Sequence, residues 1–313
     1  MTETDNKKIL QNLCHLCLVG KIYDARSAIV EEAGFSSEEL EELPDEGMED
    51  YVLENVQDPT VQKMVEIEST LKSALDVVDI NIATDSDDAK RAVRNINRIL
   101  PYMAEEDKIS AKYLQCKCYR YVETGDDLEH FNLLKEVVEK YPDYHESLSA
   151  EKVNKFLINE IKDLSVPVTD KYETIKLAQA KSPEHVRHLY HPIVASIAEL
   201  YFMQKLEQAG DSAASYKERT ENYKKAFRCI EDIDLAENVR TQYADKPEKL
   251  REFRETQHHR RKLLVLSRLE KLHKENRNMP EARAASYKKT VLCNSFYKKY
   301  PWLKSKKNEH DFV

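Results

Sequence analysis

The sequence predicts an all-α protein. Apolar residues recur at the 3.6-residue spacing of amphipathic helices along most of the chain, and the alternation typical of a half-buried strand is nearly absent. The 313 residues include only five glycines, while 41% are hydrophobic and 34% are charged. Stacked helix pairs suit this combination because they keep a large surface in water. We expect about 12 to 14 helices, mostly in antiparallel pairs, and more than about 60% helix.

Composition also excludes several classes of function. Nucleotide-binding loops need clustered glycines so that backbone amides can approach phosphate, and the five glycines are scattered. No run of about 18 apolar residues is present, as a membrane span would require. The N-terminus MTETDNKKIL carries neither a signal-peptide pattern nor a lipidation signal. We therefore expect no cofactor and no membrane contact, and a cytoplasmic protein with the nucleus as the alternative.

The N-terminal region divides into a helix pair and an acidic connector. Helices are predicted over 7–19 and 22–33, separated by Gly20 and ended by Gly34, which suits a helix C-cap. Between residues 31 and 70 the chain has 14 acids and one lysine. We assign 1–35 to the helix pair and 36–58 to the connector, expected to be a solvated loop.

The next two helices have clear start signals. Asp58 before Pro59 predicts a capped helix with proline at its first position, and Asp85 or Ser86 predicts a second cap. Their expected apolar stripes are Val61, Met64, Val65, Ile67 and Leu71 in the first helix, and Ala92, Val93, Ile96, Ile99 and Leu100 in the second.

Residues 111–144 form the most regular pattern in the chain. Leu114, Cys118 and Tyr121 follow an i, i+4, i+7 spacing, and a second apolar stripe runs from Leu134 to Tyr141. A turn is predicted at Gly125-Asp126 and a stop at Pro142. This segment therefore predicts two short antiparallel helices.

In register from Ala111 over 34 positions, this segment resembles a tetratricopeptide repeat. The matches are Leu114, Cys118, Tyr121, Gly125-Asp126, Leu134, Val137 and Pro142. His130 departs from the pattern, because the family prefers alanine where the two helices cross. The resemblance implies a right-handed solenoid of helix pairs that binds protein partners. It also implies a concave groove whose candidate partner-binding residues are Lys112, Gln115, Tyr119, Val122 and Glu123.

A weaker resemblance points to the 14-3-3 proteins, which stack antiparallel helices and hold phosphate with an Arg-Tyr pair. Arg120-Tyr121 carries it, followed by TGDD at 124–127 and by His191-Pro192-Ile193. The spacing between these motifs is shorter than in that family. The resemblance implies, as an alternative, a divergent phosphopeptide-binding protein.

Further helices complete the predicted body, 59–245, and a basic C-terminal part, 246–313. They are expected at 149–164 and 170–180, from a start signal at Ser182-Pro183-Glu184 to a turn at Gly210, and over a return helix ENYKKAFRCIEDI. A long helix is predicted over 248–275, and the last one begins at Asn278-Met279-Pro280.

Charge is strongly polarised along the chain. Residues 246–307 hold 19 Lys or Arg against 6 acids, within a chain whose net charge is -8. The candidate anion-binding residues are Arg254, Arg260, Arg261 and Lys262, which could contact nucleic-acid phosphates. The alternative to a solvated loop is that the acidic residues 38–58 dock on this basic face.

Two clusters have the residue types of metal sites. Two residues separate Cys14 from Cys17, and the chain has no second such pair. The pattern HVRHLYH spaces His185, His188 and His191 at i, i+3 and i+6. We interpret the cysteines as core and the histidines as surface residues, and we predict no metal. No nucleophile elbow, kinase motif or paired-carboxylate motif is present. The sequence thus favours a non-enzymatic adaptor that binds a peptide or partner helix, with a nucleic-acid-associated factor as the rival.

Overall fold

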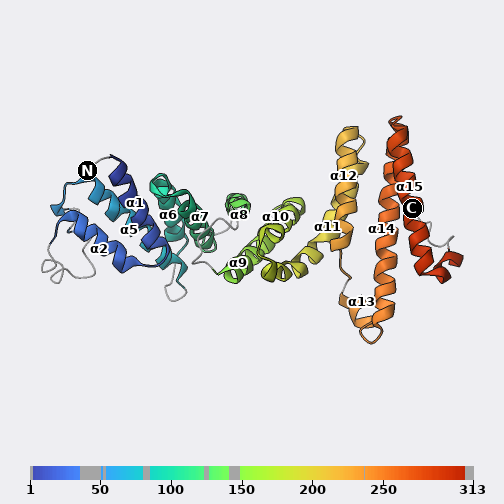
Figure 1. Cartoon of the computed structure of the whole chain (residues 1–313), viewed down its shortest axis with the longest axis horizontal. Coiled ribbons are helices and arrows are strands. Elements are labelled where there is room, and N and C mark those ends of the chain that lie inside the picture. The colour runs from blue at the N-terminus through green and yellow to red at the C-terminus, as the bar shows by residue number, and fades with distance from the viewer. Residues whose placement is uncertain are drawn as a thin grey trace. The chain divides into compact units, whose positions relative to one another are not determined.

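The computed structural model describes residues 3–35, 51, 54–79, 85–122, 127–140, 149–235 and 237–306 (Figure 1). Helices take up 86% of the described residues, and no strand occurs among them. The predicted all-α class is therefore confirmed. The turn at Gly125-Asp126, the stop at Pro142 and most of the acidic connector lie outside the described residues.

The chain forms two compact units. The first comprises Met1–Val166 and Leu177–Arg187, and the second comprises Pro167–Lys176 and His188–Val313. Helix α10 (Val168–Lys181) contributes to both units. The four-part division expected from the sequence stays a prediction.

The first unit is built from consecutive helices. They are α1 (Glu3–Leu18), α2 (Ile22–Ala33), α5 (Pro59–Val78), α6 (Ser86–Ile99), the short 3₁₀ helix η1 (Leu100–Tyr102), α7 (Glu105–Tyr119), α8 (Asp127–Lys140) and α9 (Ala150–Asp163). Helix α5 packs against α1, α2, α6 and α7, which places it at the centre of the core.

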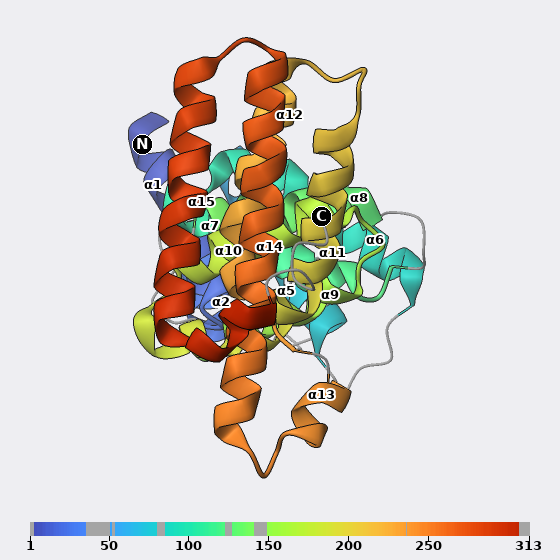
Figure 2. The same cartoon turned by 90° about the vertical axis from the view of Figure 1, so that its right-hand side faces the viewer.

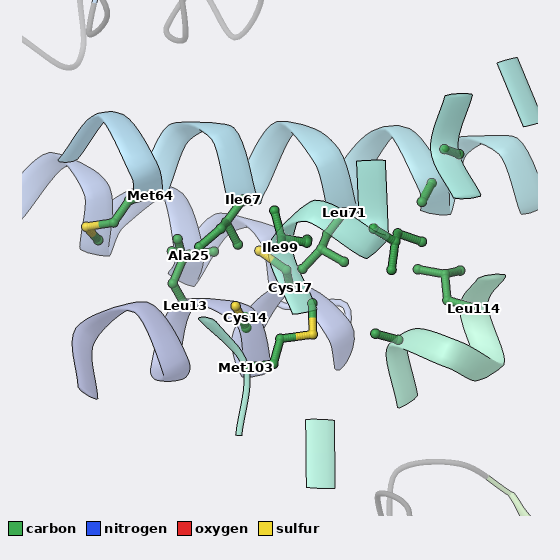
Figure 3. Close-up of a cluster of buried hydrophobic side chains, with 14 of the residues drawn as sticks. Leu13, Cys14, Cys17, Ala25, Met64, Ile67, Leu71, Ile99, Met103 and Leu114 are labelled. Carbon is green, nitrogen blue, oxygen red and sulfur yellow. The ribbon is translucent and has the colours of Figure 1, made fainter. Parts of the chain in front are cut away.

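The core of the first unit gathers side chains from α1, α2, α5, α6 and α7 (Figure 3). Leu13, Cys14 and Cys17 of α1 meet Met64 and Ile67 of α5 there, and all five are almost fully buried. Burial of this apolar surface supplies the main favourable term, about 25 cal/mol per Å² removed from water. The stripe predicted for α5 is buried throughout, and so is that of α6, except for half-buried Leu100.

Local signals set the helix ends in this unit. Gly34 adopts the left-handed conformation, φ +78°, and ends α2, as its missing Cβ allows. Asp58 caps α5 by accepting hydrogen bonds from the backbone N–H groups of Thr60 and Val61. Asp85 caps α6 by accepting from Asp88 N–H. These caps are the ones that the sequence predicts.

The start of α7 differs from the prediction. The repeat register begins its first helix at Ala111, whereas α7 begins at Glu105. Glu105, Glu106 and Asp107 occupy its first turn, where carboxylates interact favourably with the positive end of the helix dipole. The helix therefore begins six residues, about 1.7 turns, earlier than the repeat pattern requires.

The second unit contains longer helices. They are α11 (His191–Gly210), α12 (Tyr216–Cys229), η3 (Ile230–Asp232), α13 (Glu237–Gln242), α14 (Pro247–Glu275), α15 (Met279–Lys299) and η4 (Pro301–Lys306). Helix α12 packs against both α11 and α14, and α14 pairs with α15 (Figures 1 and 2). The predicted limits of α14 and α15 agree with the structure to within a residue or two.

One predicted helix is divided in two. The start signal at Ser182 opens a 3₁₀ helix, η2 (Glu184–Tyr190), and α11 begins only at His191. Pro192 is the physical reason, because its ring would clash with the carbonyl of residue 188 in a continuous α-helix. Proline is tolerated at the second position of α11, where its missing N–H costs no intrahelical bond.

Side-chain contacts join Tyr300, which follows α15, and η4 to α14 within the second unit. The Tyr300 hydroxyl donates to Oε2 of Glu255 at 2.8 Å, and Trp302 Nε1 donates to Oε1 of Glu252 at 3.0 Å. Hydrogen bonds from Lys299, Tyr300 and Arg251 lower the pKa of Glu255 to about 2, against the opposing effect of burial. The carboxylate is therefore charged at neutral pH.

None of the helices in the described residues combines the length and the apolar run that crossing a bilayer demands.

Candidate functional site

A cavity of about 220 Å³ lies between α6, α7 and α8 in the first unit. Three of the five candidate groove residues, Lys112, Gln115 and Tyr119, line it. Its other lining residues are Val93, Asn97, Leu100, Glu129, Asn132, Leu133 and Glu136. The structure thus brings together three residues that the sequence pattern placed on one helix face.

Gln115 forms the rigid polar part of this cavity. Its side chain is almost fully buried, and Nε2 donates to the backbone carbonyl of Val93 at 2.8 Å and to Oδ1 of Asn97 at 2.9 Å. A backbone carbonyl accepts hydrogen bonds and cannot donate them. The carbonyl of Val93 therefore requires that the Gln115 side chain direct its NH₂ group, and not its oxygen, towards it. Within the described residues, Gln115 Oε1 has no hydrogen-bond partner. A hydrogen bond donated by water or by a ligand would stabilise this buried oxygen.

Tyr119 is held in place by His130. The two rings stack with centroids 5.0 Å apart and planes 13° from parallel. Burial lowers the pKa of His130 to about 4, although Asp127 and a hydrogen bond with the Cys116 backbone raise it. The ring is therefore neutral at pH 7, even though Glu160 Oε2 lies 3.9 Å from its Nε2. His130 thus packs its ring against Tyr119 where α7 and α8 meet.

The edge of the cavity carries more negative than positive charge. Lys112 pairs with Glu136 of α8, and Glu129 lies one turn before Asn132 on the same helix. Glu129, Asn132 and Glu136 are exposed, whereas Gln115 and Tyr119 are buried. The cavity is thus lined by hydrogen-bonding side chains, by two carboxylates and by three aliphatic side chains, those of Val93, Leu100 and Leu133.

The two remaining groove candidates do not join this cavity. Val122 lies after the last residue of α7, in a turn, and Glu123 lies outside the described residues. The N–H groups of Tyr121 and Val122 bond to carbonyls three residues earlier, at 3.0 and 3.1 Å, which is the tight geometry of a helix that is ending. Val122 is therefore not on the helix face where the repeat pattern places it.

Sequence reasoning missed the α6 and α8 residues of the cavity. Asn97 and Asn132 look like ordinary polar helix positions, and only the packing of α6, α7 and α8 shows that they meet. One feature of the sequence could have indicated these two residues. Each asparagine directly follows an apolar residue of its helix and so lies at the border of the buried stripe.

The sequence offers Arg120 and Tyr121 as a pair that could bind phosphate. In the structure, Arg120 already forms an ion pair with the carboxylate of Glu160. Its Nε lies 2.8 Å from Oε1 of Glu160, and its guanidinium lies over the Phe156 ring at 5.7 Å. Burial raises the pKa of Glu160, and the charge of Arg120 acts in the opposite direction. Tyr121 is half-buried against the core of the first unit.

The four candidate anion-binding residues of α14 do not form one open face. Arg261 Nη2 lies 2.8 Å from Oε2 of Glu199 on α11, and Lys262 pairs with Glu231 of η3. Arg254 and Arg260 are exposed. They are six residues apart, which places them about 120° apart around the helix. The acidic residues 38–58, whose docking here is the alternative to a solvated loop, lie mostly outside the described residues.

The cysteine and histidine clusters have separate environments. Cys14 and Cys17 are fully buried, and burial raises the pKa of each thiol to about 12. His185, His188 and His191 are exposed on η2 and the first residue of α11. In the described part of the chain, no group of three or more His, Cys, Asp or Glu side chains is placed to hold a metal ion.

Comparison with protein-family models, with curated proteins and with solved structures finds no match to this chain.

Proposed function

We propose that this protein is a non-enzymatic interaction adaptor, which binds a partner peptide in the cavity between α6, α7 and α8. We further propose that its helix pairs stack as a tetratricopeptide-like right-handed solenoid. The successive packing of α5, α6, α7 and α8 supports this arrangement, as does the packing of α11 on α12 and of α14 on α15. The proposal implies cytoplasmic protein partners, with the nucleus as the alternative.

The observation that carries the proposal is the position of Lys112, Gln115 and Tyr119 around one cavity. The repeat register selected these residues from sequence alone, and helix packing brings them together with Asn97 and Asn132. A volume of about 220 Å³ is smaller than the ~300–1,000 Å³ typical of small-molecule sites. It suits one or two side chains of a bound peptide better than a cofactor.

The chemistry of the cavity suggests which peptides bind. Peptide N–H groups can donate to the side-chain oxygens of Asn97 and Asn132, which read an extended backbone without regard to sequence. Glu129 and Glu136 exceed Lys112 by one negative charge, so a basic side chain next to an apolar one suits the site.

A peptide-display selection on the full chain tests this function. Random peptides that bind are then measured by fluorescence polarisation against Asn132→Trp, which fills the cavity from an exposed position. Lys135→Trp is the matched control, because it puts the same side chain on an exposed position of α8 that does not line the cavity. We expect Asn132→Trp to weaken binding at least about tenfold and the control to leave it unchanged. Equal loss in both variants, or loss in neither, would refute the cavity as the binding site.

A nucleic-acid-associated function is the second candidate. It is favoured by exposed Arg254 and Arg260 and by two exposed aromatic rings in the same unit, Tyr287 and Trp302, whose side chains could stack on bases. Retention on RNA across a salt series distinguishes the two functions. Tight binding that falls steeply with salt, and that is abolished by Arg254→Glu with Arg260→Glu, would favour this candidate over the adaptor.

A further inference from the structure

A second cavity, of about 340 Å³, lies between α12, α14 and α15 in the second unit. Its floor is apolar and comes from all three helices. The floor residues are Phe227, Leu266, Leu269 and Ala285, and the exposed Ala284 lies at the edge. Leu266, Leu269 and Ala285 are buried, so the floor belongs to the packed core of the unit.

His273 places a hydrogen-bonding group at this floor. Its side chain is 4% exposed and lines the cavity. Asn278 Nδ2 donates to the Tyr216 hydroxyl at 2.9 Å, and the same hydroxyl lies 2.8 Å from His273 Nδ1, where either group can be the donor. A neutral imidazole that accepts at Nδ1 carries its proton at Nε2. Burial lowers the pKa of His273, so the ring is neutral at pH 7 and has one donor and one acceptor nitrogen.

Cations dominate the edge of the same cavity. Lys224 and Arg228 come from α12 and Lys288 from α15, and all three are exposed. Among the described residues no carboxylate lies within 4.0 Å of the Lys224 or Lys288 ammonium, and Arg228 reaches Glu221 only at 3.8 Å. Glu281 is the one acid that lines the cavity. The edge therefore has a surplus of two positive charges.

We infer that this cavity docks an acidic segment of a partner protein, with an apolar side chain of that segment seated against Leu266 and Leu269. Carboxylates on either side of the apolar side chain would contact Lys224 and Lys288. Charge complementarity selects an acidic partner, and the apolar floor selects a protein segment over a nucleic-acid backbone, which has no side chain to seat there. This inference does not rest on the peptide site of the first unit.

Three labelled peptides test the chemistry on the full chain by fluorescence polarisation. The probe is DDEFEDLLEDD, which combines acids with apolar anchors. DDEGEDGGEDD keeps the charge without the anchors, and KKRFKKLLKRK keeps the anchors with the charge reversed. We expect the probe to bind and each of the other two to bind at least about tenfold more weakly.

Two variants locate the binding site. Lys224→Glu with Lys288→Glu reverses the cavity edge, and we expect it to weaken the probe at least about tenfold. Lys217→Glu with Arg283→Glu is the matched control, since it makes the same charge change at exposed positions of α12 and α15 that do not line the cavity. We expect the control to stay within about twofold of the parent. Ala284→Trp fills the cavity without a charge change and should also weaken the probe.

Three outcomes overturn the inference. Equal loss in the two charge-reversal variants would show a general attraction to the basic unit. Equal binding of DDEFEDLLEDD and DDEGEDGGEDD would show a polyanion site without an apolar anchor. The third outcome concerns Ala284→Trp. If this variant has the thermal unfolding midpoint of the parent and binds the probe with unchanged affinity, the peptide binds outside the cavity.

Discussion

Arg26 of α2 donates from Nε to Oε1 of Glu68 on α5 at 2.9 Å, and the Glu68 side chain is fully buried. The pair joins two helices in the core of the first unit, among Cys17 and other apolar side chains. A carboxylate in such a place costs several kcal/mol to desolvate, and its partner has to offset that cost. Arg26 is therefore a structural residue, although its type and position look like those of a surface residue.

Removing one member of this pair should destabilise the protein more than removing both. We expect Arg26→Met to lower the free energy of unfolding by about 3–5 kcal/mol, because it removes the Arg26 guanidinium from the buried Glu68 carboxylate. The double variant Arg26→Met, Glu68→Met should recover most of that loss. Urea denaturation of the two variants measures both values, and additive losses would contradict this account.

The cap of α5 gives a second prediction. Asp58 accepts from the N–H groups of Thr60 and Val61, at 2.7 and 3.3 Å. We expect Asp58→Ala to lower the free energy of unfolding by about 1 kcal/mol, because these donors lose their acceptor. Asp58→Asn is the control, since an amide oxygen can accept the same bonds. Thermal and urea unfolding compare the two, and a loss of equal size in Asp58→Asn would assign the effect to charge instead of capping.

Helix α5 also shows what the sequence could predict. A cap residue, proline at the first position and a regular apolar stripe are local signals, and they predicted both the start of α5 and its buried face. The repeat register begins six residues after the first residue of α7, because that register takes no account of the acids at 105–107, which favour a helix start. The Arg26–Glu68 pair and the meeting of Asn97 with Gln115 were not predictable. Each depends on packing between helices that are distant in sequence.

His130 should make the stability of the protein depend on pH. Its pKa is about 4 in the folded state, against about 6.5 in an unfolded chain. Above pH 6.5 both states hold the ring neutral, and no effect arises. As the pH falls from 6.5 towards 4, the unfolded state binds the proton more readily, so stability falls by about 1.4 kcal/mol per pH unit, to a total of about 3 kcal/mol.

Urea denaturation between pH 7.5 and pH 4 measures this dependence. We expect His130→Phe, which keeps an aromatic ring against Tyr119, to have a flatter profile than the parent over that interval. His185→Gln is the control, because it removes an exposed histidine of η2. Parallel profiles for the parent and His130→Phe would show that His130 does not titrate as proposed.

The turn between α14 and α15 holds Arg277 in a strained conformation. Its φ is +57°, in the left-handed region that costs residues with a Cβ roughly 1–2 kcal/mol. We expect Arg277→Gly to raise the free energy of unfolding by up to about 1 kcal/mol, since part of the relief is offset by the greater freedom of glycine in the unfolded chain. Arg277→Ala, which retains the Cβ, is the control and should not stabilise. Thermal unfolding of both variants decides the point.

The core around α1 has a consequence for the order in which the chain folds during synthesis. Helix α1 contacts α5 and α7, and its His15 lies 3.1 Å from Asp107, 92 residues further on. Helices α14 and α15 follow each other directly and close with a three-residue turn. Contacts between distant residues have to overcome more loop-closure entropy and form more slowly than local ones. Leu13, Cys14 and Cys17 of α1 therefore stay partly uncovered during synthesis until α5 has been made, and this interval is when chaperones would be most needed.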